Sequence, residues 1–91
     1  MELRWTSAAL ADLARRLAGS PGRGRHAAAR VVQALVKAPT VLLQNPRLGE
    51  QLFEFAPREV RRMLVGRYEM RYELQGSTLY VLRLWHTREE R

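Results

Sequence analysis

Apolar residues recur at helical spacing in the first half of the chain and alternate with polar residues in the last third. Ala9, Leu10, Leu13, Ala14 and Leu17 form an apolar stripe whose successive members are one or three residues apart. This spacing predicts a helix over residues 7–18, with Thr6 at its N-cap position. The Gly- and Pro-containing segment 19–22 is expected to end that helix, because Pro cannot continue the hydrogen-bond ladder.

A second helix is predicted over residues 25–37, stopped by Pro39. Its expected buried stripe consists of Ala28, Val32, Leu35 and Val36. Two helices joined by a short turn should form an antiparallel hairpin. Residues 39–57 contain three prolines and a glycine between short apolar runs. These residues indicate an irregular segment, which can include a helical turn around 41–44.

The period of two after residue 59 predicts three strands, over 60–65, 68–75 and 78–85. Gly66-Arg67 and Gly76-Ser77 separate them, and Gly at the first of two loop positions suits a type II′ hairpin. The extended segment 3–5 can add an edge strand. We therefore expect a single α+β domain over residues 1–91, with an N-terminal helical hairpin packed on a small antiparallel sheet.

A two-residue loop at Gly76-Ser77 also predicts which residues of the last two strands face each other. The expected pairs on the inner face are Leu74–Leu79, Tyr72–Val81, Met70–Arg83 and Tyr68–Trp85. Arg83 would then lie among apolar neighbours. The outer face would carry Tyr80, Leu82 and Leu84 beside Glu69, Arg71 and Glu73.

Composition narrows the function classes. The chain has no cysteine and two histidines, His26 and His86, so neither a metal site nor a cofactor is expected. No apolar run approaches the twenty residues of a membrane span, and the first residues lack the apolar core of a signal peptide, so we expect a cytoplasmic protein. There is no glycine-rich phosphate loop and no serine in a nucleophile-elbow context, and we expect no small-molecule substrate.

The charge is strongly positive. Sixteen basic residues stand against nine acidic ones, a net charge of +7, and every basic residue except Lys37 is arginine. Such an imbalance on a small domain indicates an anionic partner, either nucleic acid or an acidic protein. Genome base composition also accounts for a preference of Arg over Lys.

Arginines and one histidine around the sheet are the side chains with candidate chemistry. Arginine can hold a phosphate, and a nearby histidine can move a proton near neutral pH, which suffices for metal-free RNA cleavage through the 2′-hydroxyl. For that reaction the candidates at the end of the last strand are Arg83, His86 and Arg88. The candidates for binding a target or a phosphate are Arg61, Arg62, Arg67, Arg71 and Arg91. The alternative is that these arginines form cross-strand ion pairs with the glutamates.

The chain resembles the RelE/ParE superfamily of bacterial toxins, most closely over residues 60–88. The resemblance rests on the runs Arg61–Leu74 and Leu79–Arg88, with Trp5, Asp12 and the segment Asn45–Gly49 in matching order. It implies the toxin of a type II toxin–antitoxin module, neutralised by a cognate antitoxin. RelE-like members cut mRNA on the ribosome, whereas ParE-like members poison DNA gyrase and are not enzymes in their own right.

One position separates these two branches. RelE-like nucleases usually carry a catalytic Arg three residues before the family's characteristic Tyr, which here is Tyr72, and this chain has Glu69 there. A carboxylate repels phosphate, so the ParE-like function is favoured, although His86 follows the last strand where some nucleases place a catalytic His. A noncatalytic nucleic-acid-binding domain is a third hypothesis. We expect the antitoxin to cover Tyr80, Leu82 and Leu84.

Overall fold

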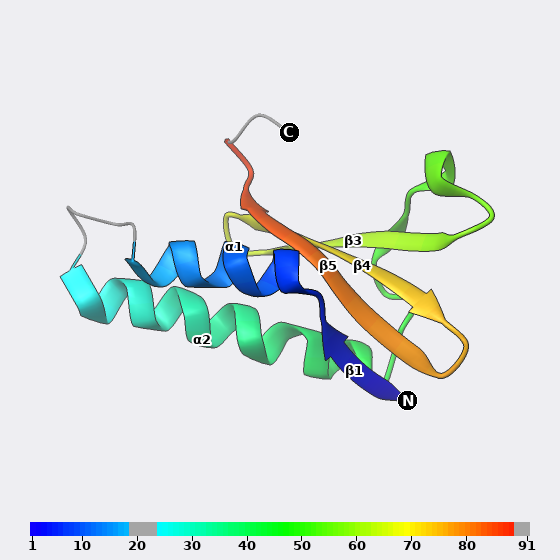
Figure 1. Cartoon of the computed structure of the whole chain (residues 1–91), viewed down its shortest axis with the longest axis horizontal. Helices are drawn as coiled ribbons and strands as arrows, with labels where there is room; N and C mark the ends of the chain where they lie inside the picture. The colour runs from blue at the N-terminus through cyan, green and yellow to red at the C-terminus, as the bar shows by residue number, and fades with distance from the viewer. Residues whose placement is uncertain (19–23, 89–91) are drawn as a thin grey trace.

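The computed structural model describes residues 1–18 and 24–88. In chain order the elements are β1 (Glu2–Trp5), α1 (Ser7–Ala18), α2 (Gly24–Leu42), β2 (Glu50–Gln51), the 3₁₀ turn η1 (Phe53–Phe55), β3 (Glu59–Val65), β4 (Tyr68–Gln75) and β5 (Thr78–His86). Figure 1 shows α1 and α2 side by side and antiparallel, extending beyond one end of a twisted sheet. The predicted α+β class and helical hairpin are confirmed. The segment 19–22, predicted to end the first helix, lies outside the described residues.

The start of α1 shows the predicted cap. The Thr6 hydroxyl oxygen accepts a hydrogen bond from the Ala9 N–H at 3.1 Å, which satisfies one of the free donors of the first turn. The Thr6 N–H donates to the carbonyl of Val81, and its hydroxyl donates to the carbonyl of Leu82 at 2.9 Å. Thr6 therefore joins the helix start to the middle of β5.

The second helix runs farther than the sequence predicted. It continues through Pro39 to Leu42, so the expectation that Pro39 stops it was wrong. Pro39 and Leu42 are buried, and the packing of this last turn outweighs the backbone hydrogen bond that proline removes. The predicted stripe was also partly wrong, because Val36 is exposed while Ala28 and Leu35 are buried.

The sheet has five strands in the order β1-β5-β4-β3-β2. The three predicted strands are present, and β1 adds the edge strand, paired in parallel with β5. The sheet is therefore mixed rather than purely antiparallel. Gly66 and Gly76 have φ of +60° and +57°, and no other residue described has positive φ, as type II′ turns require.

A β-bulge at Leu82 changes the predicted register of β5. Pairing follows the prediction as far as Tyr72 and Val81, and from there each β4 residue faces one position farther along β5. The resulting pairs are Arg71–Arg83, Met70–Leu84, Glu69–Trp85 and Tyr68–His86. The predicted pairs Met70–Arg83 and Tyr68–Trp85 were therefore wrong.

The bulge also exchanges the faces on which two large side chains lie. Leu84 was expected on the outer face, but it is fully buried in the core beside Met70. Trp85 lies instead on the outer face, across from Glu69. The core between helices and sheet comprises Ala9, Leu35, Leu42, Met70, Tyr72, Leu79, Val81 and Leu84. Burial of these side chains, at about 25 cal/mol per Å² of apolar area, holds the hairpin on the sheet.

Candidate functional site

Arg83 is bound to the first helix and does not project from the sheet as a free cation. Its guanidinium donates to both carboxylate oxygens of Asp12, at 2.8 and 3.1 Å, and the Leu84 N–H donates to the same carboxylate at 2.9 Å. Asp12 is 1% exposed and also pairs with Arg15. Burial alone raises the pKa of Asp12, but these hydrogen bonds outweigh burial and hold that pKa below its ordinary value. Strand β1 pairs with β5 only as far as Val81, so the Leu84 N–H has no partner in β1. Asp12 supplies the acceptor for that N–H.

The outer sheet face, which is the face of β3, β4 and β5 away from the helices, carries a network of ion pairs. Glu69 is completely buried, and its carboxylate lies 3.2 Å from Arg62 and 3.5 Å from Arg71. Arg62 also binds Glu50 at 2.7 Å, which raises the pKa of its guanidinium. The position where the resemblance places a catalytic Arg thus holds an acid that is neutralised from two sides.

Aromatic rings complete this face. The Arg71 guanidinium carbon lies 4.8 Å from the centre of the Trp85 ring and 5.3 Å from that of Phe55. Cation–π contacts of this kind stabilise an arginine that is largely withdrawn from water. Arg71 is therefore enclosed between two rings and a carboxylate, with little of its surface left for a phosphate.

Arg61 and Tyr72 are likewise occupied by intramolecular contacts. Arg61 donates to Glu59 and to the carbonyl of Gly49, at 2.9 and 2.7 Å. The buried Tyr72 hydroxyl accepts from the Gly49 N–H and donates to the carbonyl of Pro46, and burial raises its pKa. The family's characteristic Tyr thus fastens the segment before β2 to the sheet.

The end of β5 forms a separate surface with the β3–β4 turn. The ring of His86 meets the ring of Tyr68 edge-on at 5.1 Å, and the guanidinium carbon of Arg16 lies 5.5 Å from the centre of the Tyr68 ring. The Thr87 N–H donates to the carbonyl of Arg67 at 2.9 Å, and the Arg88 N–H donates to Nδ1 of His86 at 3.1 Å. Two sequence-predicted sets, the strand end and Arg67, therefore meet here.

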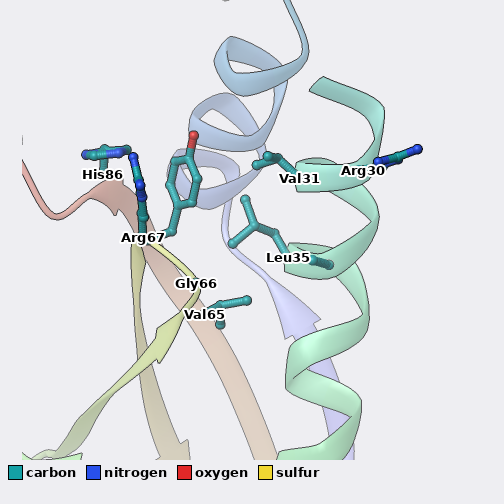
Figure 2. Close-up of a pocket in the computed structure, with 9 residues that line it drawn as sticks. Arg30, Val31, Leu35, Val65, Gly66, Arg67 and His86 are labelled. Carbon is teal, nitrogen blue, oxygen red and sulfur yellow. The ribbon is translucent and has the colours of Figure 1, made fainter. Parts of the chain in front are cut away.

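An open groove of about 260 Å³ separates this surface from α2. Its apolar floor comprises Val31, Ala34, Leu35 and Val65. Its rim carries Arg30, Arg67, Tyr68 and His86. Figure 2 shows Arg67 and His86 together on one side, with the Arg30 side chain on the other side pointing away from the groove. Sequence reasoning missed Arg30 and Tyr68, because only the packing of α2 against the turn brings them to one groove.

The three predicted catalytic residues do not form one cluster around an open site. Arg83 binds Asp12, whereas His86 packs on Tyr68, and Arg88 is exposed beyond the strand. Of the predicted binding residues, Arg61, Arg62 and Arg71 have intramolecular partners, Arg67 is exposed, and Arg91 lies outside the described residues. In the described ranges no group of three His, Asp or Glu side chains could hold a metal ion.

Comparison with known proteins identifies the family. A family model described as the ParE toxin of the type II toxin–antitoxin system parDE matches residues 3–91. The chain belongs to the ParE toxin family. No curated protein matches it in sequence.

Solved structures agree with membership of the ParE family. A chain of the chromosomal ParDE system from P. aeruginosa superposes with a TM-score of 0.76 at 26% identity, over 94% of this chain and 95% of that one. A chain of the RelBE2 toxin–antitoxin complex from Mycobacterium tuberculosis gives a TM-score of 0.64 at 28% identity, over 93% and 88%. The ParE-like fold with a helical hairpin on a sheet is therefore shared across nearly the whole chain.

In the described part of the chain no helix is both long and apolar enough to span a membrane.

Proposed function

We propose that this ParE-family toxin inhibits growth by poisoning DNA gyrase through protein contacts. The observation that carries the proposal is the state of Glu69, which is buried and ion-paired to Arg62 and Arg71 on the outer sheet face. A nuclease would need free cations at that place to bind the scissile phosphate and to stabilise its developing charge. Here the arginines at that place, Arg62 and Arg71, are already paired with Glu50 and Glu69 of the same chain.

A ribosome-dependent mRNA endonuclease is the second candidate, favoured by His86 at the strand end. A general acid or base typically contributes 10²- to 10⁴-fold to the rate. If the protein cleaves RNA, His86→Ala should therefore lower cleavage by about that factor. If it poisons gyrase, His86→Ala should change toxicity little, while deletion from residue 88 onward should weaken it.

The experiment that decides between the two targets is a short induction of the toxin in growing cells. Plasmid supercoiling and the rate of protein synthesis are measured in parallel over the first minutes. The gyrase proposal expects supercoiling and DNA integrity to change first. Early loss of protein synthesis together with cut mRNA would refute it, and supercoiling by purified gyrase provides the matched test without cells.

We further propose that a cognate antitoxin neutralises the toxin with a segment that combines acidic and aliphatic residues. Tyr80 and Leu82 remain half-buried on the outer sheet face, whereas Leu84 no longer belongs to this set, because it is fully buried in the core. The groove with its apolar floor and basic rim offers a second surface for the same segment. Apolar burial should supply most of the affinity, and salt should slow association more than it speeds dissociation. An association rate independent of ionic strength would contradict this proposal.

A further inference from the structure

The structure divides the cationic side chains into two groups. On the outer sheet face and along α1, arginines bind carboxylates of the same chain, as Arg62 binds Glu69 and Arg83 binds Asp12. Among the described side chains, those with neither an ion pair nor a side-chain hydrogen bond to the protein are Arg30, Lys37, Arg67 and Arg88. These unpaired cations therefore lie on α2, in the β3–β4 turn and directly after β5, and not around Glu69, where the resemblance places a catalytic Arg.

Two of these cations are held close to each other by the backbone. Arg67 lies in the β3–β4 turn, and the hydrogen bond from the Thr87 N–H to the carbonyl of Arg67 brings the segment after β5 to this turn. Arg88 is the next residue. We call the pair Arg67 and Arg88 the cationic end.

Glu69, the acid nearest to Arg67 in sequence, does not neutralise Arg67, and the tail Glu89-Glu90-Arg91 that follows Arg88 lies outside the described residues. Glu69 is two residues from Arg67 in sequence, but it is buried on the outer sheet face and paired with Arg62 and Arg71. Tyr68 and His86 contribute polarisable rings to the same surface, and Arg16 stacks on Tyr68. The exposed Arg67 and Arg88 are therefore available to an external anion.

We propose that the cationic end contacts the phosphate backbone of duplex DNA, and that it does so on the DNA that gyrase holds. The second clause rests on the proposed function, whereas the first can be tested with the toxin alone. Arginine offers planar pairs of donors that match phosphate oxygens. Duplex DNA carries one charge for about every 1.7 Å of its axis, so separate, exposed cations each find a phosphate without a fixed geometry. An acidic peptide offers fewer charges and needs each one matched in position.

The test measures binding of the full-length toxin to a labelled duplex of about 20 base pairs by fluorescence anisotropy, between 50 and 200 mM salt. Two phosphate contacts, by Arg67 and Arg88, predict a slope of log K against log salt of about −1.8, a loss of about 12-fold in affinity over this range. Arg67→Gln and Arg88→Gln should each reduce the slope by about 0.9. Both side chains are exposed, and circular dichroism of each variant checks that it folds.

Arg4→Gln is the matched control. It removes the same charge from an exposed arginine in β1 that pairs with Glu2, away from the β3–β4 turn, and should leave the slope unchanged. An equal reduction in Arg4→Gln would refute the proposal, since net charge alone would then account for binding. An unchanged slope in the Arg67→Gln/Arg88→Gln double variant would refute it as well. So would a double variant that binds DNA normally but associates slowly with the acidic antitoxin, because the cations would then serve a protein partner.

Gyrase assays separate failure of this inference from failure of the proposed function. If the wild-type toxin leaves gyrase supercoiling unaffected while the two variants still reduce the salt slope, the gyrase proposal fails and the DNA contact stands. If the toxin inhibits gyrase and the double variant does so equally, with an unchanged slope, the DNA contact fails and the gyrase proposal stands.

Discussion

Replacing Asp12 by Ala removes the side chain that joins α1 to the bulge of β5. The carboxylate, 1% exposed, accepts hydrogen bonds from the Arg83 guanidinium and from the Leu84 N–H. In the Asp12→Ala variant the Leu84 N–H stays buried without an acceptor. The Arg83 side chain, which is 49% exposed, can turn to water instead.

The expected loss follows from these two contacts. A buried backbone donor without a partner costs about 1–3 kcal/mol. The pair with half-exposed Arg83 adds about 0.5–1 kcal/mol, because water screens it. The free energy of unfolding should therefore fall by about 2–3 kcal/mol, which in a domain of this length lowers Tm by roughly 10–20 °C.

Urea denaturation and thermal melting followed by circular dichroism at pH 7 measure this loss. Asp12→Asn keeps an oxygen that can accept from Leu84 N–H and should lose about half as much. Arg15→Gln is the control, because Arg15 binds the same carboxylate from an exposed position, and its effect should stay within about 0.5 kcal/mol. If the free energy of unfolding of Asp12→Ala lies within about 0.5 kcal/mol of the wild-type value, Asp12 does not support the bulge.

Three further outcomes are expected. Gly49→Ala should cost about 1–3 kcal/mol by urea denaturation, because its Cβ would lie 2.6 Å from the Tyr72 hydroxyl and from a β3 carbonyl, and an unchanged midpoint would contradict this contact. Trp85→Ala should cost about 3–5 kcal/mol and reduce toxicity through misfolding, so a variant with wild-type Tm would show that the ring is not packed. Stability should decrease as the pH falls below about 4, because three carboxyl groups have a folded-state pKa below their ordinary value. A Tm that stays constant from pH 7 to pH 3 would refute this. These groups are Asp12, Glu59 and Glu73.

Local patterns predicted most of the elements because the physics involved is local. The Thr6 cap of α1 depends on residues within one helical turn, and the hairpin turns at Gly66 and Gly76 depend on a positive φ that glycine adopts readily. Pro39 was misjudged for the opposite reason. Its local preference is to end a helix, but its burial in the fold outweighs that preference.

The register of β5 could not be predicted from the strand itself. A bulge at Leu82 leaves backbone groups without strand partners, and Thr6 and Asp12 supply those partners from positions 76 and 72 residues away in sequence. With that one-residue shift Leu84 enters the core, Trp85 moves to the outer face, and Arg83 binds to α1. The candidate site changed accordingly, since each of these residues had been assigned from alternation.

The sequence by itself determined the net charge of +7, most of the helices and strands, and the acid at position 69 that distinguishes this chain from the nuclease pattern. Only the tertiary structure decided which charged side chains are paired within the chain and which stay exposed without a partner. Glu69 forms ion pairs with Arg62 and Arg71 on the outer sheet face. Arg67, in the β3–β4 turn, and Arg88, after β5, stay exposed. The physical reason is distance, because an ion pair neutralises charge only over a few ångströms, and residues far apart in sequence reach that distance only after the sheet and the helices have packed.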